Sequence, residues 1–208
     1  MRFYEIMQNG GPVMWPLLAC SLIVLTVIGE RLIFWVQIRR RRNRKLMGEI
    51  LHLAESGNWQ QIKEETRNCN DHVIRMIIVG ILHRDYDMSK AMEAEAQQRV
   101  KKMSQFMTVL DTMITVTPLM GILGTVLGII SSFEMLGAGG IADPKLVTGG
   151  IAQALITTAT GLTISIATVF PYNYFKSRIE HAIHVMEKYS TRLEVVYKKL
   201  QSRAENET

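Results

Sequence analysis

Hydrophobic and polar residues are segregated along this chain into long blocks. Three blocks are almost wholly apolar, at 13–38, 107–136 and 151–174. Each is long enough to supply the roughly 20 residues that an α-helix needs to cross the hydrocarbon core of a bilayer. The pattern therefore predicts an all-α membrane protein with three transmembrane helices.

The polar region between the first two spans, 39–102, predicts a soluble helical domain. Apolar residues recur at helical spacing over 46–56, 59–66 and 71–84, with Gly57 as a stop after the first of these helices. Ser89 is a candidate N-cap for the next helix. Because neither Pro nor Gly follows it before Pro118, we expect this helix to continue into the second span as one rod of about 45 residues, or about 70 Å.

Small and hydroxylated residues share one face of the second span. On a helical wheel at about 100° per residue, this face holds Thr117, Gly121, Gly124, Thr125, Gly128, Ser131 and Ser132. Gly124 and Gly128 form a G-x-x-x-G pair, which lets two helix backbones approach closely in a membrane. The opposite face carries large apolar side chains. One face is therefore suited to another helix or a narrow lumen, and the other to lipid.

The third span has a similar polar face. Its members are Gln153, Thr157, Thr158, Thr160, Gly161, Ser165 and Thr168. Two consecutive spans with such faces indicate that the faces meet, or that together they line a path. A packing role alone stays open, because Ser and Thr often bond the carbonyl four residues earlier in their own helix.

Charge gives the predicted topology. The chain has 208 residues, 48% of them hydrophobic and 21% charged, and a net charge of +5 that comes largely from 39–45. That run, Lys101 with Lys102, and Lys176 with Arg178 all lie on one side of the predicted spans, which favours the cytoplasm for that side. No aromatic residue interleaves with the run, so nucleic acid is not the expected partner.

The resulting segments alternate across the membrane. We predict an extracytoplasmic amino end (1–12), a first span (13–38), a cytoplasmic helical domain (39–102), and a second span continuous with a cytoplasmic helix (103–136). An extracytoplasmic loop (137–148), a third span (149–174) and a cytoplasmic carboxy-terminal helix (175–208) follow. The amino terminus is then periplasmic and the carboxyl terminus cytoplasmic.

The sequence offers no constellation for enzyme chemistry. Cys20 and Cys69 have no metal-like spacing, and no nucleophile with an adjacent base or phosphate-binding Gly loop is apparent. Glu30 and Arg31 fall in the last turns of the first span, where we expect a structural role with side chains reaching the headgroups. We predict neither an enzyme, nor a metal site, nor a cofactor.

The middle of each polar span also lacks a titratable group. Asp111 lies at the cytoplasmic end of the second span and Glu134 at its outer end. An intramembrane proton carrier needs a titratable side chain. If protons pass along these faces, that group has to come from a partner.

The motifs resemble those of the MotA/TolQ/ExbB proton channel family, most closely its three-span ExbB and TolQ branch. TPLMGILGTVLGIISSF and GGIAQALITTATGLTISIATVFPYNYF are similar to the two signature spans, and GGPVMWPLLACSLIVLTVIGERL to the first span. The resemblance implies a cyclic oligomer, a pentamer, in the bacterial inner membrane. This ring would enclose helices of an ExbD- or TolR-like partner whose aspartate carries protons, and would drive a TonB- or TolA-like protein.

The resemblance also implies roles for single residues. Thr125 and Thr158 match the family's lining threonines, and we place Gln153, Thr157 and Ser165 in the same ion pathway. Pro118, Gly121, Gly124, Gly128 and Gly161 are the helix-packing or partner-facing set. Gln153 stands where ExbB and TolQ carry a glutamate. This departure keeps open a non-conducting membrane scaffold, and a sodium-driven relative is a further alternative.

Overall fold

The computed structural model describes residues 10–67, 69, 71–138 and 144–206, and every regular element in them is an α-helix. Those helices are α2 (Met14–Arg41), α3 (Arg44–Glu55), α4 (Trp59–Glu65), α5 (His72–Leu82), α6 (Met88–Met103), α7 (Met107–Ala138) and α8 (Pro144–Asn206). Within the described residues, three helical segments are long and apolar enough to cross a membrane: α2, Met107–Glu134 and Thr148–Arg203. The all-helical fold and the three long apolar helices confirm the coarse prediction of a membrane protein.

The chain divides into two compact units. The first comprises 1–31 and 106–175, and so holds the beginning of α2, α7 and the apolar part of α8. The second comprises 32–105 and 176–208, and holds the end of α2, the helices α3 to α6 and the tail of α8. The polar region therefore forms a unit separate from the one that contains most of the apolar helices.

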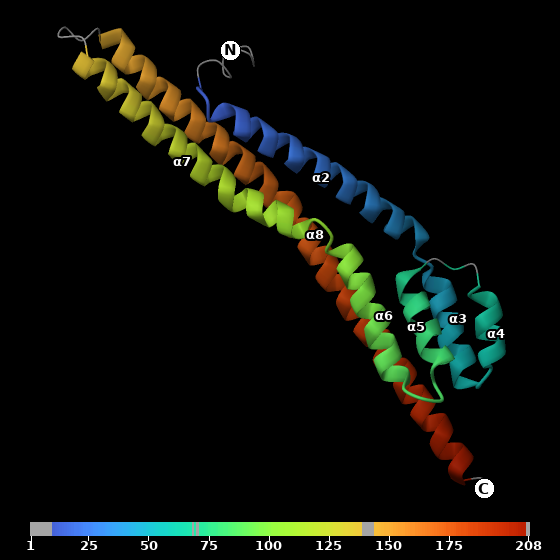
Figure 1. Cartoon of the computed structure of the whole chain (residues 1–208). Coiled ribbons are helices and arrows are strands. Elements are labelled where there is room, and N and C mark those ends of the chain that lie inside the picture. The colour runs from blue at the N-terminus through green and yellow to red at the C-terminus, as the bar shows by residue number, and fades with distance from the viewer. Residues whose placement is uncertain (1–9, 68, 70, 139–143, 207–208) are drawn as a thin grey trace. The chain divides into compact units, whose positions relative to one another are not determined.

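In the first unit, α7 and α8 run antiparallel and side by side (Figure 1). The start of α2 joins them, since Val13, Met14 and Leu17 are buried and pack with Met120 and Ile164. The large apolar side chains that the wheel assigns to the outer face of α7 are exposed, from Leu119 to Ile130. This exposed apolar surface fits lipid or a further membrane helix.

The second unit has its own apolar core. Ile50 of α3, Ile62 of α4 and Ile77 of α5 are at most 1% exposed, and Met92 of α6 and Leu193 of α8 are fully buried with them. The tail of α8 thus supplies part of the core of the polar region. A contiguous core of this kind stabilises a domain mainly through the area removed from water.

Side-chain caps begin four of the helices in this unit. Asn43, Asn58, Asp71 and Asp87 each accept a hydrogen bond from a backbone N–H in the first turn that follows, at 2.8–3.5 Å. These bonds satisfy N–H groups that lack a partner within the helix. Gly57, at φ +71°, separates α3 from α4, which confirms it as the predicted stop.

The predicted uninterrupted rod through 90–136 is wrong. α6 ends at Met103 and α7 begins at Met107, with Ser104 as the C-cap of α6. Phe106 has a φ of +64°, in the left-handed region, which a right-handed helix cannot include. Its ring lies 5.5 Å from the Arg31 guanidinium, a contact that offsets the cost of this conformation.

Two other helix boundaries differ from the sequence prediction. Asp87, rather than Ser89, is the N-cap of α6, because the Asp87 carboxylate accepts from the Lys90 backbone N–H at 3.0 Å. The loop expected over 137–148 is shorter, since α7 continues to Ala138 and α8 begins at Pro144; residues 139–143 lie outside the described part. The segments 149–174 and 175–208 belong to a single helix up to Asn206, despite Pro171.

Candidate ion pathway

The polar face of α7 is a row of buried small residues. Thr117 is fully buried, and Gly121, Gly124, Gly128 and Ser132 follow it at intervals of three or four residues, all buried. Between 148 and 170, the buried positions of α8 are Ala154, Thr157, Gly161, Ser165 and Thr168. The two faces that the wheels predict are thus the faces turned away from the surface of this unit.

These faces meet at backbone distance. A methyl group added to Gly121 would lie 3.0 Å from Thr158 Cα, and one added to Gly161 would lie 2.4 Å from the Thr117 carbonyl oxygen. At Gly128 the added group would lie 3.0 Å from Ala154 Cβ. The seam, as we call this α7–α8 contact, has no space for a lumen at these three levels. The prediction that the polar faces meet is confirmed.

Two hydroxyl groups join the helices across the seam. Thr158 Oγ1 donates to the Gly121 carbonyl oxygen at 2.8 Å, and Ser165 Oγ donates to the Ile114 carbonyl oxygen at 2.7 Å. The Gly121 carbonyl also faces the backbone N–H of Thr125 in the next turn of α7, so it accepts the Thr158 bond with a second lone pair. The Ile114 carbonyl has no such partner, because residue 118 is proline and lacks an N–H, so the Ser165 hydroxyl supplies the bond that Pro118 removes. Within one chain, these hydroxyls tie the two helices together.

Thr157 and Gln153 connect α8 to the segment before α2. Thr157 Oγ1 lies 3.0 Å from the Gly10 carbonyl oxygen and 2.8 Å from the Gln153 carbonyl oxygen. The Gln153 amide lies directly over Gly11, where an added methyl group would overlap Gln153 Nε2 at 1.7 Å. Gly11 also has a φ of +70°. The site where the family resemblance expects a glutamate is thus beside the backbone that leads into α2.

Thr125 and Pro118 lie at the edge of the seam. Both are half-buried, and Thr125 Oγ1 donates to the Ile122 carbonyl oxygen in its own helix at 2.6 Å. Thr160 and Thr168 likewise bond carbonyls of their own helix, at 2.8 and 2.6 Å. The structure therefore separates the hydroxyls that cross the seam from those that stay within a helix, and a role in ion passage stays a prediction for each.

The seam holds no charge. From 112 to 133 and from 148 to 174 the sequence has no Asp, Glu, His, Lys or Arg. Among the described residues, no group of three or more His, Cys, Asp or Glu side chains is placed to hold a metal ion. The site can orient water or a passing cation through hydroxyl and carbonyl oxygens, but it cannot itself exchange a proton at neutral pH.

Arg31 is the buried charge that the sequence did not predict. We expected its side chain to reach the headgroups, but it is 1% exposed. Its guanidinium donates to the Glu30 carboxylate and lies over the Phe106 ring. No sequence signal marks this contact, because it depends on the left-handed turn at Phe106, 75 residues later.

Comparison with known proteins identifies the family of this chain. The model of the MotA/TolQ/ExbB proton channel family matches residues 66–188, which include α5, α6, α7 and most of α8. The chain belongs to this family. Both helices of the seam lie in the matched region, so the small and hydroxylated face falls within the part that the family shares.

Relatives of the chain come from the ExbB and TolQ branch. It is 33% identical over 201 residues to the putative biopolymer transport protein ExbB-like 3 of Synechocystis sp., covering 94% of this chain and 95% of the relative. It is 27% identical over 172 residues to the biopolymer transport protein exbB1 of Vibrio cholerae, covering 79% and 75%. The Tol-Pal system protein TolQ of Pseudomonas aeruginosa is 36% identical over 96 residues, or 46% and 42%. Family membership and the apolar helices together support a bacterial inner-membrane protein.

Proposed function

We propose that this chain is the ExbB- or TolQ-like subunit of an inner-membrane motor that proton flow drives. In this proposal several copies, five by analogy, surround membrane helices of an ExbD- or TolR-like partner. The partner supplies the carboxylate, and the motion passes to a TonB- or TolA-like protein that acts in the envelope. The amino terminus faces the periplasm and the carboxyl terminus the cytoplasm.

The hydroxyl-rich, charge-free pair of helices α7 and α8 is the observation that carries this proposal. Their packing at Gly121 and Gly161 excludes a lumen between them in one chain. Any aqueous path would therefore run along the outside of the pair, between copies or against a partner. Thr125 is half-buried at the edge of the seam, so its hydroxyl can contact water or an ion on the outside of the helix pair.

The driving force is adequate for such work. One elementary charge that crosses 100 mV releases about 2.3 kcal/mol. Several protons per stroke therefore supply enough free energy to rearrange a protein interface of modest size. The coupling ion is the proton in this proposal, and the chain needs no resident cofactor.

The test is ion flux in proteoliposomes that contain this chain with an ExbD-like partner. We expect proton flux in the wild type, and its loss when the partner's membrane aspartate is changed to asparagine. Replacing the proton gradient with a sodium gradient of equal size distinguishes the sodium-driven alternative. Flux that survives the change in the partner would overturn the proposal of a partner-supplied carrier.

A non-conducting scaffold is the second candidate, and Gln153 is the observation that favours it. A neutral amide in place of the family's glutamate removes a titratable group from α8. No flux in an intact complex, and its appearance with Gln153→Glu, is the result that the scaffold predicts. Flux in the wild type that Gln153→Glu leaves unchanged supports the motor instead.

A further inference from the structure

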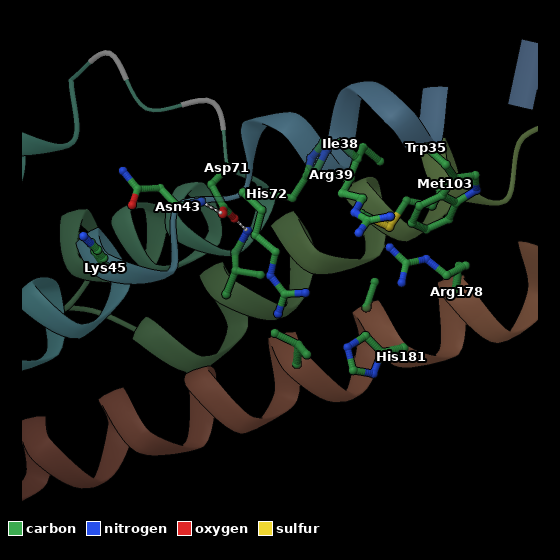
Figure 2. A pocket seen from close by; sticks show the side chains of 14 residues that line it. Trp35, Ile38, Arg39, Asn43, Lys45, Asp71, His72, Met103, Arg178 and His181 are labelled. Atoms are coloured by element: carbon green, nitrogen blue, oxygen red, sulfur yellow. Dashed lines mark hydrogen bonds between the residues drawn. The ribbon is translucent and has the colours of Figure 1, made fainter. Parts of the chain in front are cut away.

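A basic pocket lies within the second unit, where α2 ends. It has a volume of about 630 Å³, and Trp35, Arg39 and Arg42 line it from α2 and the residues just after it. Arg178 and His181 line it from α8 (Figure 2). All of these residues belong to the same compact unit. The pocket is separate from the seam between α7 and α8.

The charge of the lining is strongly positive. Arg39, Arg42, Lys45 and Arg178 contribute four cations, and Asp71 is the carboxylate among the lining residues. That carboxylate is already engaged, because it accepts from the backbone N–H groups of Asn43 and Val73 at 3.0 and 2.8 Å. Most of the positive charge around the pocket is therefore not neutralised by its own walls.

Two buried N–H groups on the wall lack an acceptor. Trp35 is 5% exposed, and neither its indole Nε1 nor Arg178 Nε has a hydrogen-bond partner in the described part of the chain. The Arg178 guanidinium stacks 5.5 Å from the centre of the Trp35 ring. Unpaired buried donors are uncommon in folded proteins, and here they show that this wall offers no acceptor to offset its positive charge.

The position along α2 identifies the kind of anion. Trp35 and Arg39 occupy the end of an apolar helix of membrane-spanning length, whose last turn carries Arg39, Arg40 and Arg41. Tryptophan and arginine concentrate at the level of lipid headgroups, and basic pockets at the ends of spans suit anionic lipids. Guanidinium groups also match phosphate oxygens in geometry as well as charge.

We propose that this pocket binds the phosphate group of an anionic phospholipid, with Arg39 and Arg178 as its main ligands. The headgroup enters from the membrane end of α2, and the acyl chains remain against the apolar side of that helix. The site would anchor the second unit at the membrane surface. It is independent of the proposed ion pathway.

Binding of defined lipids to the full-length protein tests the proposal. Native mass spectrometry in a neutral detergent compares phosphatidylglycerol with phosphatidylcholine of the same acyl chains. We expect a tightly bound phosphatidylglycerol that phosphatidylcholine does not replace. Equal binding of the two lipids would overturn the proposal.

Charge-matched variants separate the pocket from a general surface attraction. Arg39→Gln with Arg178→Gln removes two lining cations, and Arg40→Gln with Lys176→Gln removes two cations that do not line the pocket, from the same helices. The first pair should weaken phosphatidylglycerol binding by about tenfold or more, as expected for lost charge-assisted hydrogen bonds. The second pair should leave it within about twofold. An equal loss in both pairs would contradict a specific site.

Arg39→Gln alone guards against a folding defect, because Arg39 is exposed and removing its charge leaves the apolar core intact. Inorganic phosphate distinguishes a lipid headgroup from free phosphate as the ligand, and it is added both to the protein alone and to the protein with bound phosphatidylglycerol. Displacement of phosphatidylglycerol only at high phosphate concentration supports a lipid site. Tight, Arg39-dependent binding of inorganic phosphate without a preference for phosphatidylglycerol would overturn the assignment to lipid.

Discussion

The hydroxyl group of Thr158 donates a hydrogen bond across the seam to the carbonyl oxygen of Gly121, at 2.8 Å. This bond lies where the two backbones are so close that a methyl group on Gly121 would be 3.0 Å from Thr158 Cα. Gly121 has no side chain, so the two backbones can come this close, and at this distance the Thr158 hydroxyl reaches the Gly121 carbonyl oxygen. A residue that the family resemblance assigns to ion passage therefore also has a structural task.

Because Thr158 bonds across the seam, a change at Thr158 should affect the stability of the protein as well as any ion flux. Thr158→Val keeps the shape of the side chain but removes the donor, so α7 and α8 lose one hydrogen bond. Such bonds between membrane helices contribute about 0.6 kcal/mol on average and up to about 1.7. We expect a lower thermal unfolding midpoint for the full-length protein in lipid nanodiscs, measured by circular dichroism.

Two variants control for this effect. Thr163→Val removes a hydroxyl that bonds the Ala159 carbonyl in its own helix, on an exposed position, and should change the midpoint less. Thr158→Ser restores the donor and should recover most of the loss. If Thr158→Val lowers ion flux while the midpoint stays at the wild-type value, the hydroxyl acts mainly in the pathway.

Gly161 is the least replaceable glycine of the seam. A methyl group there would lie 2.4 Å from the Thr117 carbonyl oxygen and 3.2 Å from Gly121 Cα, both backbone atoms that cannot rotate away. Gly161→Ala should force α7 and α8 apart and destabilise the protein by about 1–3 kcal/mol, as overpacking does. The measurement is the unfolding midpoint in the same nanodiscs.

Gly149→Ala is the matched control for that change, because Gly149 lies in α8 and a methyl group there meets no atom within 4 Å. It should be neutral, or stabilising by about 0.5–1 kcal/mol, because alanine has less backbone freedom than glycine in the unfolded chain and so loses less entropy on folding. Equal destabilisation by both variants would show that the loss at Gly161 does not come from the seam.

The seam was predictable because it depends on local periodicity. Gly121, Gly124 and Gly128 share a face at any helical geometry, and a row of small residues in an apolar helix has few uses other than close packing. The partner face on α8 could be read in the same way from Thr157, Gly161 and Ser165. That the hydroxyls of Thr158 and Ser165 cross between helices, while that of Thr125 does not, depends on rotation of the helices and needs coordinates.

The break at 104–106 was not predictable on the same grounds. Ser104, Gln105 and Phe106 include neither Pro nor Gly, and a phenylalanine at positive φ is rare. The conformation is held by a contact with Arg31, far away in sequence. The basic pocket could not be predicted from the sequence for the same reason, because Arg39 and Arg178 are far apart in the chain and line one pocket only after folding.

The contact between Arg31 and Phe106 predicts a large effect from a single charge. Arg31 is 1% exposed, so Arg31→Gln leaves a smaller group among atoms that packed against the guanidinium, and it leaves the Glu30 carboxylate without this partner. We expect a destabilisation of about 1–3 kcal/mol, because the buried guanidinium loses its packing and its contact with the Phe106 ring, while the exposed Glu30 carboxylate is hydrated instead. Arg40→Gln, on an exposed position of the same helix, should be near neutral. A midpoint that is the same in both variants would contradict the structural role of Arg31.

His72 predicts how the second unit responds to acid. Burial lowers the pKa of His72 below its ordinary value of 6.5, and the Arg99 charge lowers it further, while Asp71 opposes the shift. Arg99 Nη1 lies 3.0 Å from His72 Nδ1, so the neutral imidazole accepts a hydrogen bond that an imidazolium cannot accept. Arg99→Gln should therefore raise the pKa of His72, whereas Arg75→Gln, an exposed cation of α5, should leave it unchanged.

The sign of the pH dependence follows from this shift. The unfolded chain takes up a proton at His72 near the ordinary pKa, and the folded chain does so only at lower pH, so acid favours the unfolded state. The contribution of His72 to stability is complete above about pH 7.5 and is lost as the pH falls through 6.5 towards the folded pKa. Histidine-selective NMR of the full-length protein in nanodiscs gives the pKa directly, and midpoints at pH 7.5 and 5.5 give the change in stability. A His72 pKa at or above 6.5 would contradict the buried, Arg99-bonded imidazole, because both influences act to keep that ring neutral.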